Sequence, residues 1–212
     1  MKYHHYNKSV RERHLEKLYK GIRRFQDSYY KKERDFFKRL SKGQKPEALF
    51  ITCVDSRVDP NLLTQSRPGE LLTLRTPGNI IPPFGNIEDG NSSAGTLEFA
   101  VIELKVKDII LCGHSGCGAI EALYKSAEEL KTMPHLKDWL QLAAPVRKMI
   151  ERNYSKVTPE SRQRLTEEEN VLYQLHNVQT YPFVDQAVKE ERLNLHGWYY
   201  DICKGDVYTA HA

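Results

Sequence analysis

Three short, unbroken apolar runs constrain the fold of this chain more than any other feature. They lie within Ala48–Thr52, Leu71–Leu74 and Asp108–Cys112. Runs of this length without polar alternation are typical of strands that are buried on both faces. The segments between them repeat apolar residues at three- and four-residue spacing, which predicts helices. Strands that alternate with helices indicate an α/β fold with a parallel sheet.

The remaining predicted elements extend this pattern along the chain. Two further strands are expected, at Leu193–Tyr200 and, as a short edge strand, at Asp206–Tyr208. Helices are expected over residues 8–22, 27–41, 93–104, 117–130, 134–151 and 165–179. The fold is therefore predicted to be α/β, with a mostly parallel four-stranded sheet, a short fifth edge strand, helices on both faces and an N-terminal helical arm. Residues 1–42 are predicted to form this arm, and residues 43–212 the α/β part of the same domain.

Composition argues against several classes of protein. The 212 residues suit one domain, and a mean hydropathy of -0.62 without any apolar run of about 20 residues argues against a membrane partner. Residues 1–40 hold thirteen Lys or Arg against five Asp or Glu, a surplus that could bind nucleic acid. No nucleic-acid reading motif accompanies it, so we expect a solvated helix face and no nucleic-acid partner. The first residues lack the apolar stretch of a secretory signal, which predicts a cytoplasmic location, with a bacterial microcompartment as the alternative.

Ionisable side chains gather where two of the predicted strands end. Cys53, Asp55 and Arg57 follow the first strand, and His114 and Cys117 follow the third. In open parallel sheets the carboxyl ends of the strands share one edge, and ligands bind there. Two cysteines and one histidine suit zinc, and three protein ligands leave a fourth position open, as in catalytic zinc sites. We therefore predict a zinc site built from Cys53, His114 and Cys117.

Asp55 and Arg57 lie beside this predicted site. A carboxylate there can orient a zinc-bound hydroxide, or it can bind the metal and close the open position, and an arginine fork can hold it in place. Gly113 belongs to a glycine-rich stretch that allows the backbone to approach a small substrate closely. Cys112 and Cys203 are expected to be buried small residues rather than ligands.

The segments CVDSRVDPNLL, RPGELLTLRTPGNIIPP and IILCGHSGCGAIEAL resemble the β-class carbonic anhydrases. The resemblance runs from about Gln44 to Tyr208. It implies a zinc enzyme with one Zn2+ per subunit, which hydrates carbon dioxide reversibly to bicarbonate and a proton by attack of zinc-bound hydroxide. It also implies the roles of five residues: Cys53, His114 and Cys117 as zinc ligands, and Asp55 with Arg57 as the catalytic pair.

The resemblance extends to the substrate pocket and to the assembly. Gln44 matches a glutamine that the family uses to hydrogen-bond an oxygen of the substrate. Leu72 and Phe99 fall where the family places apolar or aromatic pocket residues. The basic arm matches one that family members use to embrace a partner subunit, which implies a homodimer unit, or a tetramer or larger assembly built from it.

One type within the family is favoured. Allosteric members carry a tryptophan where this chain has Phe50, and Gln44 belongs to the plant-like, non-allosteric type. Arg75 occurs in both types and does not discriminate between them. Asp55 is then expected to rest on Arg57 and to bind zinc only in a closed state.

Two alternatives stay open at this stage. A related zinc hydrolase would act on CS2 or COS by similar chemistry, and access to the pocket, rather than the identity of the ligands, would distinguish it. A non-catalytic protein with structural zinc would need a fourth protein ligand. The open three-ligand set and the pair of Asp55 and Arg57 favour the carbonic anhydrase.

Overall fold

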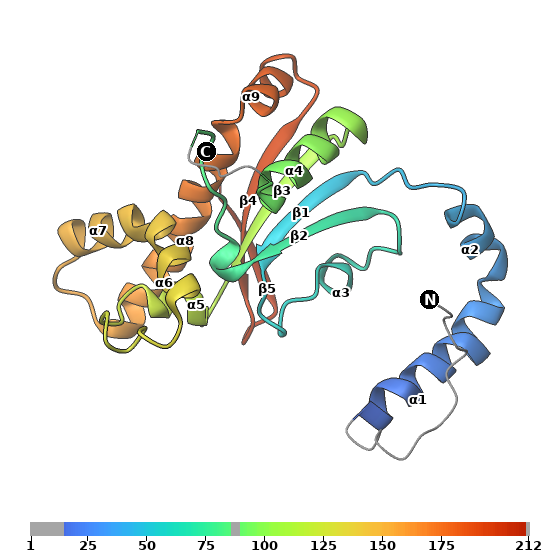
Figure 1. Ribbon diagram of the computed structural model, residues 1–212, viewed down its shortest axis with the longest axis horizontal. Coiled ribbons are helices and arrows are strands. Elements are labelled where there is room, and N and C mark those ends of the chain that lie inside the picture. The colour runs from blue at the N-terminus through green and yellow to red at the C-terminus, as the bar shows by residue number, and fades with distance from the viewer. Residues whose placement is uncertain (1–14, 86–89, 211–212) are drawn as a thin grey trace. The chain divides into compact units, whose positions relative to one another are not determined.

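The computed structural model describes residues 15–85 and 90–210 of the chain (Figure 1). The chain divides into two compact units, Met1–Gln44 and Lys45–Ala212. Among the described residues, no helix combines the length and the apolar character that a membrane crossing requires.

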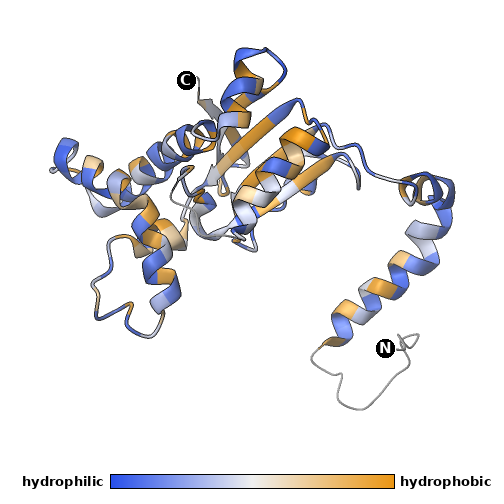
Figure 2. Cartoon of the chain, turned by 45° about the horizontal axis from the view of Figure 1, so that its top comes forward, coloured by the Kyte–Doolittle hydropathy of each residue, from blue (hydrophilic) through white to orange (hydrophobic). Residues whose placement is uncertain are grey.

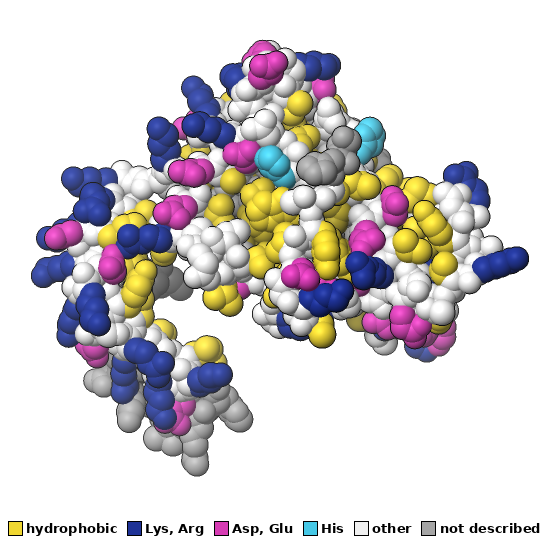
Figure 3. Space-filling view, turned by 180° about the vertical axis from the view of Figure 1, so that it is seen from behind, with side chains coloured by type: hydrophobic (Ala, Val, Ile, Leu, Met, Phe, Trp, Pro, Cys, Tyr) yellow, Lys and Arg dark blue, Asp and Glu magenta, His cyan; other side chains and the backbone are white. Residues whose placement is uncertain are grey.

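The N-terminal unit is a succession of short helices: α1 (Glu16–Arg24), a π-helical segment (Phe25–Tyr30) and α2 (Arg34–Leu40). Of the first predicted helix, residues 8–14 lie outside the described part of the chain. None of the unit's described residues is buried, and Leu18 is 63% exposed. Hydrophobic residues colour bands of α1 orange in Figure 2, and lysine and arginine side chains gather over the unit in Figure 3. This unit therefore carries apolar side chains that it does not bury by itself.

A five-stranded sheet forms the centre of the second unit, as predicted. Its order is β2-β1-β3-β4-β5; the first four strands are parallel, and β5 pairs antiparallel with β4 at one edge. The strands are β1 (Ala48–Cys53), β2 (Leu71–Thr76), β3 (Asp108–His114), β4 (Asn194–Asp201) and β5 (Asp206–Ala210). All six residues of β1 and six of the seven in β3 are buried, which confirms the interpretation of those two apolar runs. For the run in β2 the prediction of burial on both faces is wrong, because β2 lies at an edge of the sheet and only Leu74 and Thr76 of its six residues are buried.

Helices surround the sheet, and most occupy the predicted segments. They are α3 (Pro60–Thr64), α4 (Ser92–Glu98) with a π-helical continuation (Phe99–Glu103), α5 (Gly118–Ala122), α6 (Pro134–Leu140), α7 (Ala144–Asn153), α8 (Pro159–Gln179) and α9 (Pro182–Lys189). The short α3 and α9 were not predicted. Helix α8 begins six residues earlier than expected, at a cap in which Thr158 Oγ1 accepts a hydrogen bond from the Ser161 N–H.

The helix predicted over residues 117–130 is wrong in its second half, because α5 ends at Ala122. The chain then passes through turns in which Glu129 Oε2 accepts hydrogen bonds from both the backbone N–H and the hydroxyl of Ser126. Together with the bond from the Glu129 N–H to Ser126 Oγ, this reciprocal pairing is a capping box, which begins a new turn instead of continuing α5. The apolar spacing in the sequence did not reveal this new start.

The two faces of the sheet bury different sets of side chains, because successive residues of a strand point to opposite faces. Leu49 and Ile51 lie in a large cluster with residues of α4, α8 and α9. Phe50 and Ile110 lie in a smaller cluster, against which Leu63 of α3 packs. Helices thus contribute to the core on both faces.

A third apolar cluster lies at the carboxyl ends of the strands. It contains Cys53 at the end of β1, Cys117 before α5, and Ile120 and Leu140 from α5 and α6. The pairing of Thr52 with Cys112 places the ends of β1 and β3 side by side. The fold therefore brings the two predicted ligand segments together at one edge of the sheet.

Candidate metal centre

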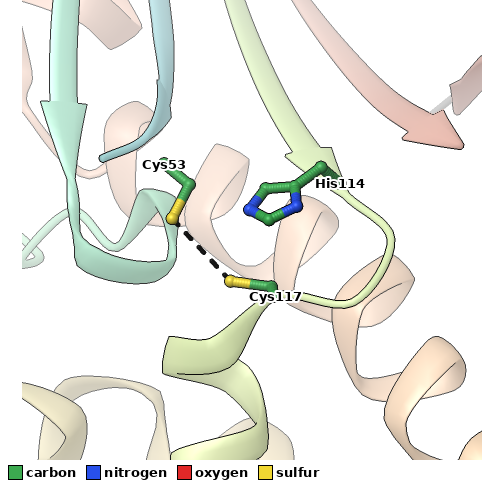
Figure 4. Close-up of side chains that lie close together, drawn as sticks. All are labelled: Cys53, His114 and Cys117. Carbon is green, nitrogen blue, oxygen red and sulfur yellow. Dashed lines mark hydrogen bonds between the residues drawn. The ribbon is translucent and has the colours of Figure 1, made fainter. Parts of the chain in front are cut away.

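Three side chains converge where β1 and β3 end. Cys53 is the last residue of β1, His114 is the last residue of β3, and Cys117 immediately precedes α5. Their ligand atoms all lie within 4.8 Å of one another, and Figure 4 shows the three side chains directed toward a common centre. Cys53 and Cys117 are buried, and His114 has no exposed surface. The predicted ligand set is therefore assembled in the structure.

The donor atoms fit a zinc ion. The sulfurs of Cys53 and Cys117 are 3.8 Å apart. Two sulfurs that each bind zinc at about 2.3 Å in a tetrahedron are separated by about the same distance. Nδ1 of His114 lies 3.1 Å from the carbonyl oxygen of Ser115, to which it donates as N–H, so Nε2 keeps its lone pair. Among the described residues Nε2 has no hydrogen-bond partner although it is buried, and a metal ion would satisfy it.

The electrostatics of the cluster favour a negative charge on sulfur. The hydrogen bond from Cys117 is the main cause that lowers the pKa of Cys53 to about 4, and the same bond raises the pKa of Cys117. Cys53 Sγ also accepts a hydrogen bond from the Gly78 N–H at 3.3 Å. Burial lowers the pKa of His114, but the hydrogen bond and charge of Cys53, together with Ser115 and Asp55, outweigh burial, and the net shift is upward. A divalent cation would stabilise both thiolates and the neutral imidazole.

Asp55 and Arg57 form a two-pronged ion pair beside the ligand cluster. Arg57 donates from Nε to Oδ1 of Asp55 at 2.9 Å and from Nη2 to Oδ2 at 2.7 Å. The backbone N–H of Arg57 adds a third bond to Oδ1 at 2.9 Å. These bonds hold the pKa of Asp55 well below its usual range. Asp55 Oδ2 lies 3.9 Å from Nε2 of His114, so the carboxylate faces the ligand cluster from one side.

Two arginines tie the segments of the site to one another. Arg57 Nη2 donates to the carbonyl oxygen of Gly116, in the loop between His114 and Cys117, at 2.8 Å. Arg75 of β2 donates to the carbonyl oxygens of Cys53 and Asp55, at 3.0 and 2.6 Å. The structure thus shows for Arg75 a contact that the sequence did not predict.

Polar residues of α8 lie behind the ligands, and sequence reasoning missed them. Glu167 accepts a hydrogen bond from the Cys117 N–H at 2.7 Å, and Asn170 donates to the Gly78 carbonyl at 2.9 Å. Both side chains are buried. The sequence does place these polar residues on one helix face with the apolar Val171, which could have marked them as buried. It does not show which groups they contact.

Three residues predicted to line the substrate pocket are placed as follows. Gln44 ends the N-terminal unit and is exposed. Leu72 pairs in register with Leu49, far from the carboxyl end of β2, and packs against the large core cluster. Phe99 begins the π-helical segment after α4 and is 43% exposed. Substrate contact by these residues stays a prediction.

Gly113 and the two remaining cysteines have different surroundings. A Cβ at the buried Gly113 would lie 2.6 Å from Cγ2 of Val171, so the packing of α8 on β3 requires glycine there, and a substrate contact stays a prediction. Cys112 is buried as expected, and burial raises its pKa to about 12. The expectation that Cys203 is buried is wrong: this residue is exposed, because it lies in the turn between β4 and β5.

Comparisons with known proteins agree with the geometry. A family model described as carbonic anhydrase matches residues 48–207. A carbonic anhydrase of Synechococcus elongatus is 42% identical over 193 residues, which cover 91% of this chain and 70% of that protein. A carbonic anhydrase of Pseudomonas aeruginosa is 43% identical over 187 residues, which cover 88% of this chain and 83% of that protein.

Solved structures that resemble this chain are also β-carbonic anhydrases. The β-carbonic anhydrase CcaA superimposes with a TM-score of 0.89 at 41% identity, covering 92% of this chain and 87% of that chain. A Coccomyxa β-carbonic anhydrase in complex with acetazolamide has a TM-score of 0.81 at 30% identity, covering 92% of this chain and 85% of that one.

These likenesses confirm the predicted fold and the predicted zinc chemistry. The family match together with the Cys53, His114 and Cys117 cluster favours hydration of carbon dioxide over the CS2 or COS hydrolase and over the structural-zinc protein. With its fold, its ligand cluster and its relatives in agreement, the chain belongs to the β-class carbonic anhydrases, zinc enzymes that interconvert carbon dioxide and bicarbonate.

Proposed function

We propose that Asp55 and Arg57 are the catalytic pair of this carbonic anhydrase, and that Asp55 works from beside the metal rather than as a ligand. The observation that carries the proposal is the two-pronged ion pair between them. Both carboxylate oxygens accept from Arg57, and the group of residues that could hold the ion comprises Cys53, His114 and Cys117 without Asp55.

The residues present would hold zinc through Cys53, His114 and Cys117. When bound, zinc supplies Lewis acidity that makes water nucleophilic near neutral pH. Two thiolates donate more charge than imidazoles, so we expect hydration activity to rise through mildly alkaline pH. Stopped-flow rates that stay flat from about pH 6 to 9 would contradict this expectation.

Asp55 has an acceptor position available for the reacting water. Its Oδ1 receives two hydrogen bonds and its Oδ2 receives one, from Nη2 of Arg57. Because a carboxylate oxygen has two lone pairs, Oδ2 keeps one on the side of the ligand cluster. Asp55 therefore accepts a hydrogen bond from the attacking water and orients it. Arg57 keeps the carboxylate ionised and fixes its direction.

The pocket roles of Gln44, Leu72, Phe99 and Gly113 belong to the same proposal. Gln44 would donate its amide N–H to an oxygen of carbon dioxide or bicarbonate, and the apolar side chains would exclude water. The plant-like type rests on Gln44 and on Phe50, which stands where allosteric relatives carry tryptophan. Substituting Gln44 by Ala should raise KM for carbon dioxide more than it lowers kcat, and an unchanged KM would remove Gln44 from the pocket.

We further propose that the chain assembles as a homodimer unit, or as a tetramer or larger assembly built from it, through residues 1–42. The support is the exposure of large apolar side chains in this unit: Leu15, Leu18, Ile22 and Phe25 are each more than 40% exposed. A structure of a β-carbonic anhydrase from Sordaria macrospora matches this chain at 26% identity, and its description names two tetrameric enzymes of that fungus. Removal of residues 1–41 should yield monomers with weak activity, and an active monomer in sedimentation would contradict the proposal.

A cytoplasmic location, with a bacterial microcompartment as the alternative, is also a proposal. Its support is that all four cysteines are free, as is usual in a reducing compartment. Cell fractionation with an antibody against the chain would decide between the two compartments.

The experiment that tests the catalytic roles combines metal analysis with stopped-flow hydration of carbon dioxide. Asp55→Ala should keep one zinc per subunit and lose most of its activity. Loss of zinc in this variant would make Asp55 mainly a ligand, and full activity would remove it from the mechanism.

A further inference from the structure

Among its buried polar residues, helix α8 carries four amide or carboxylate side chains along one face. They are Glu167, Asn170, Gln174 and Asn177, and none is more than 3% exposed. Buried polar groups are costly unless they are hydrogen-bonded, so a row of them calls for an explanation. None of the four has a role in the reaction described above.

Glu167 is bonded to one zinc ligand. Its Oε1 accepts from the backbone N–H of Cys117 at 2.7 Å and from Nε2 of Gln163 at 3.0 Å. Its Oε2 accepts from the hydroxyl of Tyr199 at 2.9 Å. Two side chains thus hold the carboxylate while it holds the Cys117 amide. Since Sγ is only three bonds from that nitrogen, fixing the amide restricts where the sulfur can lie.

Asn170 is linked to the other cysteine, Cys53, through the backbone of Gly78. Its Nδ2 donates to the carbonyl oxygen of Gly78 at 2.9 Å, and the N–H of Gly78 donates to Sγ of Cys53 at 3.3 Å. Gln174 Nε2 donates to Oδ1 of Asn170 at 2.9 Å and so orients its amide. Asn170 therefore fixes the residue whose N–H stabilises the Cys53 thiolate.

The height of α8 above the sheet is set by contact with two glycines. A Cβ at Gly113 would lie 2.6 Å from Cγ2 of Val171, and one at Gly197 would lie 3.1 Å from its Cγ1. Val171 thus packs directly on the backbones of β3 and β4. Because Val171 adjoins Asn170 and is one turn from Glu167, this contact also fixes the distance of both polar side chains from the ligand segments.

We propose that Glu167 and Asn170 are positioning residues, through which α8 sets the separation and direction of the two zinc thiolates. Glu167 acts on Cys117 through its amide, and Asn170 acts on Cys53 through Gly78. The ligand set is thereby arranged before the metal enters, which lowers the cost of binding it. The inference rests on the zinc assignment and is independent of the proposed roles of Asp55 and Arg57.

Zinc affinity and the absorption of the Co2+-substituted enzyme test the proposal without measuring catalysis. Glu167→Ala and Asn170→Ala should each weaken zinc binding by about 10- to 100-fold in competition with a chelator, as loss of a supporting partner does in other zinc sites. Both should shift the visible Co2+ bands, because the angle between the sulfurs changes. Asp55→Ala should leave the affinity and the bands near those of the wild type, which separates this inference from the proposed function.

Asn177→Ala is the matched control. Asn177 lies on the same helix face and is 3% exposed; it donates to the Ile81 carbonyl at 2.9 Å and to Gln174 Oε1 at 3.0 Å, and its bonds do not reach Gly78 or a ligand residue directly. Its loss should reduce stability to a similar degree, yet change zinc affinity by less than about threefold. Equal loss of affinity in Asn177→Ala and Asn170→Ala would overturn the proposal for Asn170, since the effect would then follow stability alone.

Glu167→Gln separates position from charge. Its amide oxygen can still accept from the Cys117 N–H, so zinc affinity should stay within a few-fold of the wild type. A loss equal to that of Glu167→Ala would overturn the positioning role. If an alanine variant does not fold, Glu167→Asp and Asn170→Ser, which shorten the side chains, should show the same loss of affinity, and wild-type affinity in both would overturn the proposal.

Discussion

The front and the back of the metal centre are built in different ways. At the front, Asp55 and Arg57 come from one turn after β1, and the Arg57 side chain is 52% exposed. At the back, Glu167 and Asn170 come from a helix far along the chain, and both are buried. The front carries an ion pair beside the ligand cluster, whereas the back carries hydrogen bonds to the ligand segments. The comparison indicates that the chemistry is encoded locally and the geometry over long distances.

The largest expected loss of activity follows removal of zinc, which concerns the front and the back of the metal centre at once. Removal of zinc with a chelator should reduce hydration activity to the uncatalysed rate, because neither region supplies a Lewis acid. Addition of zinc should restore it, as measured by stopped flow together with metal analysis. Cys203→Ser serves as a control: its side chain is exposed and lies outside the ligand cluster, so metal content and activity should not change. If hydration activity survived complete removal of zinc, the reaction would not depend on the metal centre, and the comparison of its front and back would say nothing about catalysis.

The second largest effect is a loss of catalytic efficiency that follows a change in the front of the metal centre alone. Asp55→Asn removes the negative charge while keeping the shape, and should lower kcat/KM by roughly 100-fold, the usual scale for a group that handles a proton. Zinc content and the unfolding transition should change little. A drop in zinc content would show that front and back are not separable.

A third change affects the packing of the back. Gly113→Ala places a methyl group 2.6 Å from Val171, so α8 must move or strain, at a cost of about 1–3 kcal/mol in the free energy of unfolding. Gly95→Ala in α4, where a Cβ meets nothing within 4 Å, should instead stabilise by about 0.5–1 kcal/mol. Urea titration measures both, and a neutral Gly113→Ala would show that α8 is not tightly seated.

The smallest effect is the pH dependence of the front pair. Arg57 holds the pKa of Asp55 below its ordinary value, so the pair's contribution to stability is complete above about pH 4 and is lost as the pH falls further. Because Arg57 is half exposed, the contribution should be below about 1 kcal/mol. The difference in unfolding free energy between wild type and Asp55→Asn should be constant from pH 5 to 8 and narrow below about pH 4. A change between pH 5 and 8 would assign the titration to another group.

The sequence predicted those parts of the molecule whose cause is local. The apolar runs gave β1, β2 and β3, and the rule for parallel strands brought Cys53 to His114 and Cys117. It could not predict the contacts of Glu167, because Cys117 is 50 residues away and only the docking of α8 brings them together.

Other errors of the sequence-based predictions also have physical causes. The segment after α5 has helical apolar spacing, but Ser126 and Glu129 exchange capping bonds that begin a separate turn instead of continuing the helix. Cys203 was assigned to the core by residue type, although the tight connection between β4 and β5 exposes it. Gln44, Leu72 and Phe99 were placed by family resemblance alone, and their pocket roles stay predictions.

The two hydrogen bonds that Arg57 donates from one nitrogen have a consequence for how the site can move. One nitrogen, Nη2, serves both the Asp55 carboxylate and the Gly116 carbonyl. Rotation of the carboxylate toward the ion would therefore alter the hydrogen bonding of the loop between two ligands in the same event. The two motions behave as one coordinate, so the carbonyl resonance of Gly116 would report on the side-chain state of Asp55.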